Sequence, residues 1–306
     1  YYGEDSEENN FFRANIIANA SLEVGGQTVD AATITPALLQ ALQEIDGVEA
    51  NVATGYHAIE FLLWGQDLNG TDAGAGARVH TDFDLTNCTN GNCDRRAQYL
   101  TAATDLLITD LKEIVAAWDA GGAARADLDI KTDAEGIAAI LTGLGSLSYG
   151  ELAGERMKLG LILHDPEEEH DCFADNTHNS HYYDALGMQN VYLGKYTAAD
   201  GTVTEVPSLA SLTNGVNAEL NAQMKAKLDA TMAAMQIMKD RADGGIESYD
   251  QMIGFGNDEG NAVVQAAIDA LVDQTRSIEA LVAVLGASDI SVEGSDSLDN
   301  PTAVFQ

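Results

Sequence analysis

Helical periodicity runs through most of this chain and limits the folds open to it. Apolar residues recur three and four positions apart over residues 94–118, 212–241 and 258–285, which is the spacing of one face of an α-helix. Strand-like alternation is lacking, apart from a hairpin predicted near residues 191–206. The methionines within 212–241 continue the apolar stripe, so we assign them to the core and not to a metal site. The chain is therefore predicted to be all-α.

Start and stop signals predict further helices. Thr35-Pro36 opens a short helix, because a capping hydroxyl followed by proline favours a first helical turn. Thr132 and Glu135 have the spacing of a capping box that opens a helix to about residue 164. Glycines recur every seven residues along this helix and indicate close approach of a neighbour. Asp94 is the predicted N-terminal cap of the helix over residues 94–118. Another helix is predicted over 49–64 and ends at Gly65. The chain is therefore predicted to contain about six substantial helices.

One of these helices carries a histidine and a carboxylate side by side. His57 and Glu60 lie three residues apart within an otherwise apolar segment, so a helix places them on one face. A carboxylate among apolar neighbours requires a cation, a metal ion or strong hydrogen-bond donors. From the spacing alone, a salt-bridged core glutamate beside a satisfied histidine is favoured over a metal site.

Several motifs resemble one protein family. They are Gly55-x-His57-x-x-Glu60 with Trp64-Gly65-Gln66-Asp67 after it, Asn87-Cys88, the segment 91–96, the segment 150–157, the segment 169–177 and the segment 190–194. Their sequences and order resemble the imelysin-like superfamily, most closely the branch known as iron-regulated protein A. The resemblance extends from about Thr35 to Gly286 and so covers most of the chain.

The resemblance implies a fold and a domain division. It implies two similar four-helix-bundle domains with the functional site in the cleft between them. We expect an incomplete N-terminal bundle over residues 1–131 and a C-terminal bundle over 132–306 with a long irregular insertion at 165–207. Six predicted helices instead of eight indicate that N-terminal helices of the first bundle precede Tyr1.

The site residues expected from the motifs fall into two sets. His57, Glu60 and Glu151 are the predicted metal ligands, and Glu155, Arg156, His170 and Asp175 are predicted to bind the ligand. A carboxylate–guanidinium ion pair, in which Arg156 neutralises Glu60 or Glu155, remains an equal alternative. Four of the six histidines lie within residues 164–181; we place the site in Glu169–Thr177 and take His178 and His181 as incidental.

Peptidase chemistry is disfavoured by the residues themselves. A zinc peptidase helix carries two histidine ligands and a glutamate base, as in H-x-x-E-H. Here Phe61 follows Glu60, so the second histidine is missing. The resemblance implies a protein of iron uptake, and we expect it to bind a metal ion or a metal-bearing ligand, with iron favoured and zinc or another divalent ion next. A metallohydrolase and a structural interaction module are the alternatives, and no haem attachment motif is present.

The net charge and the cysteines indicate which partners are excluded and which compartment the protein occupies. The balance of 49 acidic to 15 basic residues, net −34, excludes nucleic acid as a partner. No segment is long and apolar enough to be a transmembrane helix. Cys88 and Cys93 flank a turn-forming Thr-Asn-Gly-Asn sequence, which predicts a disulfide and an oxidising compartment. We expect an exported protein at the periplasm or cell surface, its leader removed, with a membrane-anchored or uptake-system partner.

Overall fold

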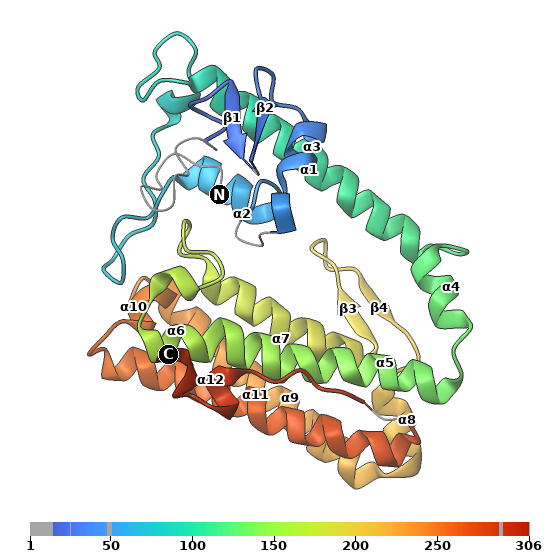
Figure 1. Cartoon of the computed structure of the whole chain (residues 1–306). Coiled ribbons are helices and arrows are strands. Elements are labelled where there is room, and N and C mark those ends of the chain that lie inside the picture. Colours follow the sequence, from blue (N-terminus) through green and yellow to red (C-terminus); the bar gives the residue numbers. More distant parts are fainter. Residues whose placement is uncertain (1–14, 25, 48–50, 288–289, 306) are drawn as a thin grey trace. The chain divides into compact units, whose positions relative to one another are not determined.

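A computed structural model describes residues 15–24, 26–47, 51–287 and 290–305. Its contacts divide the chain into two compact units. The N-terminal unit comprises Tyr1–Leu68 and Ala75–Ala126, and the C-terminal unit comprises Asn69–Gly74 and Asp127–Gln306. Helices dominate both units (Figure 1), so the all-α prediction is confirmed.

The N-terminal unit is built around one long helix, α3 (Cys93–Trp118). Helices α1 (Pro36–Leu42) and α2 (Gly55–Trp64) pack against it. The capping prediction for α1 is confirmed, since the Thr35 side chain accepts a hydrogen bond from the Leu38 amide. Two 3₁₀ turns, at Ile45–Gly47 and His80–Phe83, complete the connections.

Two details of this unit differ from the sequence prediction. Residues 49 and 50 of the helix expected over 49–64 lie outside the described residues, and residues 51–54 are not helical. The helix begins at Gly55, whose positive φ of 87° belongs to a turn. The residue before α3 is Asn92 in the left-handed region, so Asp94 lies in the first turn instead of capping it.

An antiparallel hairpin in the N-terminal unit was not expected. Strands β1 (Ser21–Val24) and β2 (Gln27–Asp30) pair with Ser21 opposite Asp30. Leu22 and Val24 alternate with exposed residues on β1, a buried face too short to stand out as a strand. The hairpin predicted near 191–206 is confirmed as β3 (Lys195–Thr197) and β4 (Val203–Glu205) of the C-terminal unit.

Four long helical segments form the C-terminal unit (Figure 1). The first runs without a break through α5 (Asp133–Ser146), the π-helical turns η4 (Leu147–Lys158) and α6 (Leu159–Leu163), and its predicted capping box at Thr132 is present. The others are α7 (Thr177–Leu193), α9 (Ala218–Asp243) and α11 (Asp258–Leu285). Short elements join them: α4 (Ala123–Asp129), η5 (Pro166–Glu168), α8 (Leu209–Val216), α10 (Tyr249–Ile253), α12 (Asp296–Asp299) and η6 (Ala303–Phe305).

Apolar faces of these four segments make the core. Buried Met224, Met235 and Met238 of α9 confirm that the methionine stripe is core. The helix predicted over 212–241 is interrupted at Asn217, whose side chain caps α9 and separates it from α8. None of the described helices is long and apolar enough to span a membrane.

Residues 165–207 were predicted to form an irregular insertion, and this prediction is wrong. It contains α7, a helix of 17 residues. The buried face of α7 begins with Thr177, His178 and His181 and becomes apolar only from Ala185 onward. Because polar residues occupy the buried positions, apolar periodicity could not reveal this helix.

Cys88 and Cys93 form the predicted disulfide, with their Cα atoms 5.9 Å apart. It closes the loop directly before α3, and Arg96 holds the same loop by donating to the carbonyls of Asp82 and Gly91. Thiol counting in denaturant without reductant is expected to find one reactive thiol per chain, that of Cys172. Three thiols in protein from an oxidising compartment would contradict the assignment.

Candidate functional site

The start of α2 is held firmly, and this determines where His57 lies. The Gln43 side-chain oxygen accepts hydrogen bonds from the amides of Ala53 and Thr54 and from the Thr54 hydroxyl. The buried Tyr99 of α3 donates its hydroxyl to the Ala53 carbonyl at 3.0 Å. Both contacts fix the chain one turn before the motif. The motif is thus carried by a positioned helix and not by a loop.

His57 and Glu60 are in contact, as the spacing predicts. The His57 Nδ1 atom lies 3.0 Å from Glu60 Oε2. Ala58, Phe61 and Leu62 are the buried residues of α2. The His57 side chain is 36% exposed and that of Glu60 only 10%, so the carboxylate is largely removed from water while the imidazole remains accessible. An imidazole and a carboxylate in this arrangement can share a proton or ligate one metal ion.

Glu151 and Arg156 form an ion pair that the sequence analysis did not predict. Arg156 Nε and Nη2 lie 2.9 and 2.8 Å from Glu151 Oε1. The two residues are five apart, and π-helical hydrogen bonds join residues at that spacing. Arg156 is therefore paired with Glu151 and not with Glu155, and the pair is about half exposed.

Glu155 points to a different part of the C-terminal unit. Its carboxylate accepts a hydrogen bond of 2.6 Å from the Ser295 hydroxyl, in the segment that leads into α12. Glu151 instead contacts Arg156, so the two glutamates have different partners. That these two glutamates act at one site stays a prediction.

His170 and Asp175 lie in the loop before α7, which is tied to the first turn of that helix. The Asp171 amide donates to the Thr177 hydroxyl at 2.8 Å, and the Ser180 hydroxyl donates to the Asp171 carboxylate. Asp175 adopts a left-handed φ of 50° just before the helix. The loop that carries the family-like motif is thus a fixed structure with its polar side chains gathered at the α7 N-terminus.

His181 and Asp184 are the functional candidates that sequence reasoning missed. The His181 ring is fully buried, 6.2 Å from the ring of His170 and 4.9 Å from that of Tyr249, with edge-on geometry to both. Ligand atoms of His170, His181 and Asp184 all lie within 4.8 Å of one another. The spacing of His181 and Asp184, three residues apart, was available as a signal, but helix α7 was not foreseen. His178, also taken as incidental, contacts Asp243 of α9 at 3.2 Å.

Burial changes the protonation of this cluster. Burial lowers the pKa of His181 to about 3, with His170 and Arg156 adding to the effect. Burial also raises the pKa of Asp184 to about 6, assisted by the charges of Asp171 and Glu151 and opposed by Arg156. The pKa of the Glu169 carboxyl is raised well above its ordinary value by burial and then by Asp250. At neutral pH, His181 is therefore a neutral imidazole, the form that binds metals.

The lowered pKa of His181 predicts an acid-sensitive fold. The unfolded chain takes up a proton as pH falls below 6.5 and the folded chain does not, so stability is lost as pH falls from 6.5 toward 3. Between pH 7 and 5, the wild type should lose about 2 kcal/mol more of its free energy of unfolding than His181→Leu. Asp184 acts in the opposite direction in this window, but it is common to both proteins. Urea titrations with chelator at both pH values test this, and equal losses would contradict it.

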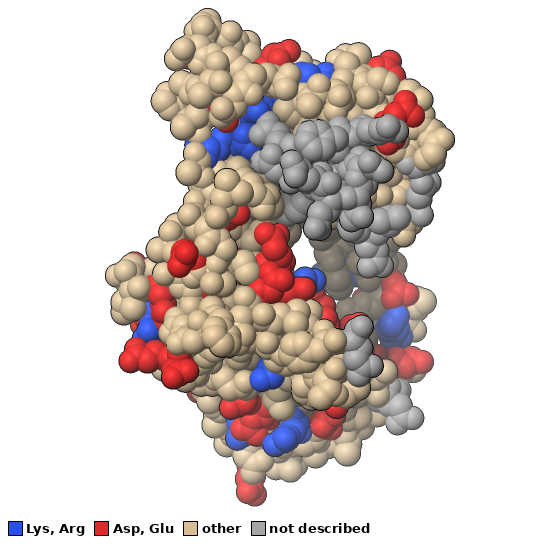
Figure 2. Space-filling model, turned by 60° about the vertical axis from the view of Figure 1, so that its left-hand side comes forward, with Lys and Arg blue, Asp and Glu red and all other residues tan. Residues whose placement is uncertain are grey.

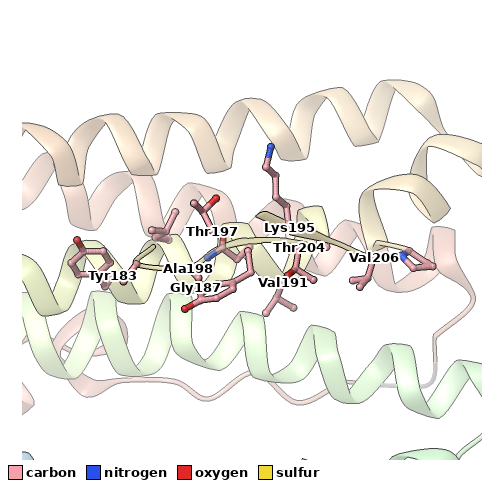
Figure 3. A pocket seen from close by; sticks show the side chains of 14 residues that line it. Tyr183, Gly187, Val191, Lys195, Thr197, Ala198, Thr204 and Val206 are labelled. Carbon is pink, nitrogen blue, oxygen red and sulfur yellow. The ribbon is translucent and has the colours of Figure 1, made fainter. Parts of the chain in front are cut away.

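A cavity of about 960 Å³ lies between α7 and the β3–β4 hairpin (Figure 3). Its lining is mainly apolar and aromatic, with Tyr183, Leu186, Val191, Tyr196 and Val206 among the contributors. Lys195 is its one charged lining residue among those described. None of the predicted site residues lines this cavity, so we do not assign the expected metal chemistry to it.

Comparison with models of protein families gives a match. The sequence model of the imelysin family matches residues 14–278. No curated protein matches the chain. The matched range includes the G-x-H-x-x-E motif, the Glu151–Arg156 pair and the whole of α7.

Proposed function

The chain belongs to the imelysin family, and from this premise we propose that it is an exported protein of iron uptake that binds a metal ion through His57 and Glu60. The observation that carries the proposal is the contact of 3.0 Å between His57 Nδ1 and Glu60 Oε2 on a positioned helix. Iron is the favoured ion and zinc or another divalent ion the next, because imidazole and carboxylate ligands suit these metals. A metal-bearing ligand of the same kind is an equivalent cargo.

The chemistry of the pair fits a metal ion. The nearly buried Glu60 supplies negative charge where solvent cannot easily provide counterions. His57 remains accessible and can offer a neutral nitrogen. Acidic side chains are spread over the face of the molecule drawn in Figure 2, and the net charge of −34 raises the local concentration of cations around the whole chain.

Other parts of the proposal come from the sequence motifs. The resemblance to the iron-regulated protein A branch supports the role in iron uptake, and the Cys88–Cys93 disulfide supports export to the periplasm or cell surface. A membrane-anchored component of the uptake system is the proposed partner. Arg156, paired with Glu151, is proposed to orient an anionic part of the ligand.

Substitution of the pair separates binding from structure. His57→Ala and Glu60→Gln are each expected to weaken Fe(II) or Co(II) binding by at least about 100-fold, more than the loss of an outer-shell partner. The melting temperature of the metal-free protein should change by less than about 4 °C if the pair serves metal binding and not the stability of the fold. Titration calorimetry and thermal melts of the same samples give both quantities.

Two exposed residues of the same types serve as controls. His80→Ala and Glu113→Gln, both in the N-terminal unit, should leave binding and melting unchanged. Unchanged affinity with a strongly lowered melting temperature in Glu60→Gln would mean that the pair is structural, since a broken buried pair leaves a stranded charge. Chelator-sensitive peptide cleavage that Glu60→Gln abolishes would instead establish the hydrolase alternative; we expect no cleavage by the wild type.

A further inference from the structure

We infer that His170, His181 and Asp184 form a second binding site, for a divalent transition-metal ion, made entirely of residues of the C-terminal unit. The proposed metal site of His57 and Glu60 contributes no residue to it. The inference rests on the placement of these three side chains, on the burial of His181 and on the charges around them.

The three side chains already converge. Their ligand atoms lie within 4.8 Å of one another, whereas bonds of about 2.0–2.2 Å to one metal ion place ligand atoms about 3–4.4 Å apart. Side-chain movements of about 1 Å would therefore bring the three ligand atoms to metal-binding distance. His181 and Asp184 are one turn apart on α7, the same spacing as His57 and Glu60 on α2. His170 is held beside them by the contacts of Asp171 with Thr177 and Ser180.

His181 has no polar contact that would account for its burial. Its side chain is fully buried, and neither ring nitrogen has a hydrogen-bond partner among the described residues. Leaving such polar atoms unsatisfied destabilises the fold, a cost that an apolar residue of similar size would avoid. A metal ion bound at one nitrogen would relieve it. A role in core packing alone would not explain why the imidazole of His170 and the carboxylate of Asp184 lie beside His181.

The donor set and the local charge indicate the class of ion. Two imidazoles and one carboxylate suit iron(II), zinc, cobalt(II) or manganese(II) better than calcium or magnesium, which prefer oxygen ligands. The carboxylates of Asp171 and Glu151 act on Asp184 electrostatically, and the guanidinium of Arg156 opposes them. The surroundings therefore carry excess negative charge that a divalent cation would compensate.

Cobalt(II) binding to the whole chain tests the inference. Equilibrium dialysis should find two equivalents on the wild type and one on His181→Leu, with the affinity of the lost site reduced by at least about 100-fold. Metal-free His181→Leu should melt at or above the wild-type temperature, because an unsatisfied imidazole is replaced by an apolar side chain. Asp184→Asn, which keeps the shape of the side chain, should also bind one equivalent. His178→Gln, three residues away on the same helix, is the matched control and should bind two.

The double variant His57→Ala/Glu60→Gln separates this site from the first. It should keep one equivalent, and adding His181→Leu should remove it. If the wild type binds one equivalent that only His181→Leu removes, the second site stands and the proposed function fails. The inference is overturned if His181→Leu and Asp184→Asn bind as much cobalt as the wild type. It is equally overturned if the double variant and His181→Leu each abolish a single shared equivalent.

Discussion

Replacing Arg95 with alanine is expected to lower the free energy of unfolding of the N-terminal unit by about 3–5 kcal/mol, because a charged donor shared by several acceptors is lost. The Arg95 guanidinium on α3 donates to five main-chain carbonyls, those of Ile16, Ile17, Asn19, Ala31 and Ala32. These groups flank the β1–β2 hairpin on both sides. Without the arginine, the hairpin loses its main polar attachment to α3.

Tryptophan fluorescence measures this effect directly. Trp64 and Trp118, the two tryptophans of the chain, both lie in the N-terminal unit. Urea unfolding followed by their emission should show a lower midpoint for Arg95→Ala. Arg125→Ala is the control, since Arg125 donates to a single exposed carbonyl, that of Trp118, and its loss should cost less than about 0.5 kcal/mol. Similar midpoints for the two variants would contradict the role given to Arg95.

Alanine substitutions at Gly154 and Gly143 are expected to have opposite effects on stability. A Cβ atom at Gly154 would overlap the Ser295 side chain, and the Ser297 hydroxyl donates to the Gly154 carbonyl at 2.9 Å. Gly154→Ala should therefore displace the segment that leads into α12 and cost about 2–4 kcal/mol. Exposed Gly143 on α5 has nothing within 4 Å of the added Cβ, so Gly143→Ala should stabilise by about 0.5–1 kcal/mol.

Circular dichroism during urea unfolding reports on both substitutions. Opposite shifts of the midpoint, downward for Gly154→Ala and upward for Gly143→Ala, are the expected result. Destabilisation by both variants would mean that helix geometry, and not the segment around Ser295, requires glycine at these positions.

Much of the fold could be predicted from local signals. Helix α11 follows its predicted boundaries, and the capping box at Thr132 marks the start of α5, because both depend on short-range chemistry that the sequence states directly. Of the glycines that recur every seven residues, Gly150 has a close neighbour, but this neighbour is the backbone of Glu293 and not another helix, and Gly143 has nothing within 4 Å of an added Cβ. The spacing of the glycines predicts a close neighbour at Gly150 but does not identify which segment of the chain it is.

The candidate site was predictable only where both partners lie on one regular helix. His57 and Glu60 meet as expected, because spacing alone determines their contact in an α-helix. The partner of Arg156 was missed, because the π-helical turns of η4 shift which residues share a face. His181 and Asp184 were missed because the buried face of α7 begins with polar residues, and a pattern of apolar burial cannot show a helix that buries histidines.

Metal content of protein purified without chelators tests the central claim most directly. Wild type and the double variant His57→Ala/Glu60→Gln would be loaded with iron(II) under anaerobic conditions, dialysed and analysed for iron per chain. We expect the double variant to retain one equivalent less than the wild type, with an unchanged circular dichroism spectrum. Equal iron contents in the two proteins, or no bound metal in the wild type, would contradict the claim that His57 and Glu60 bind a metal ion.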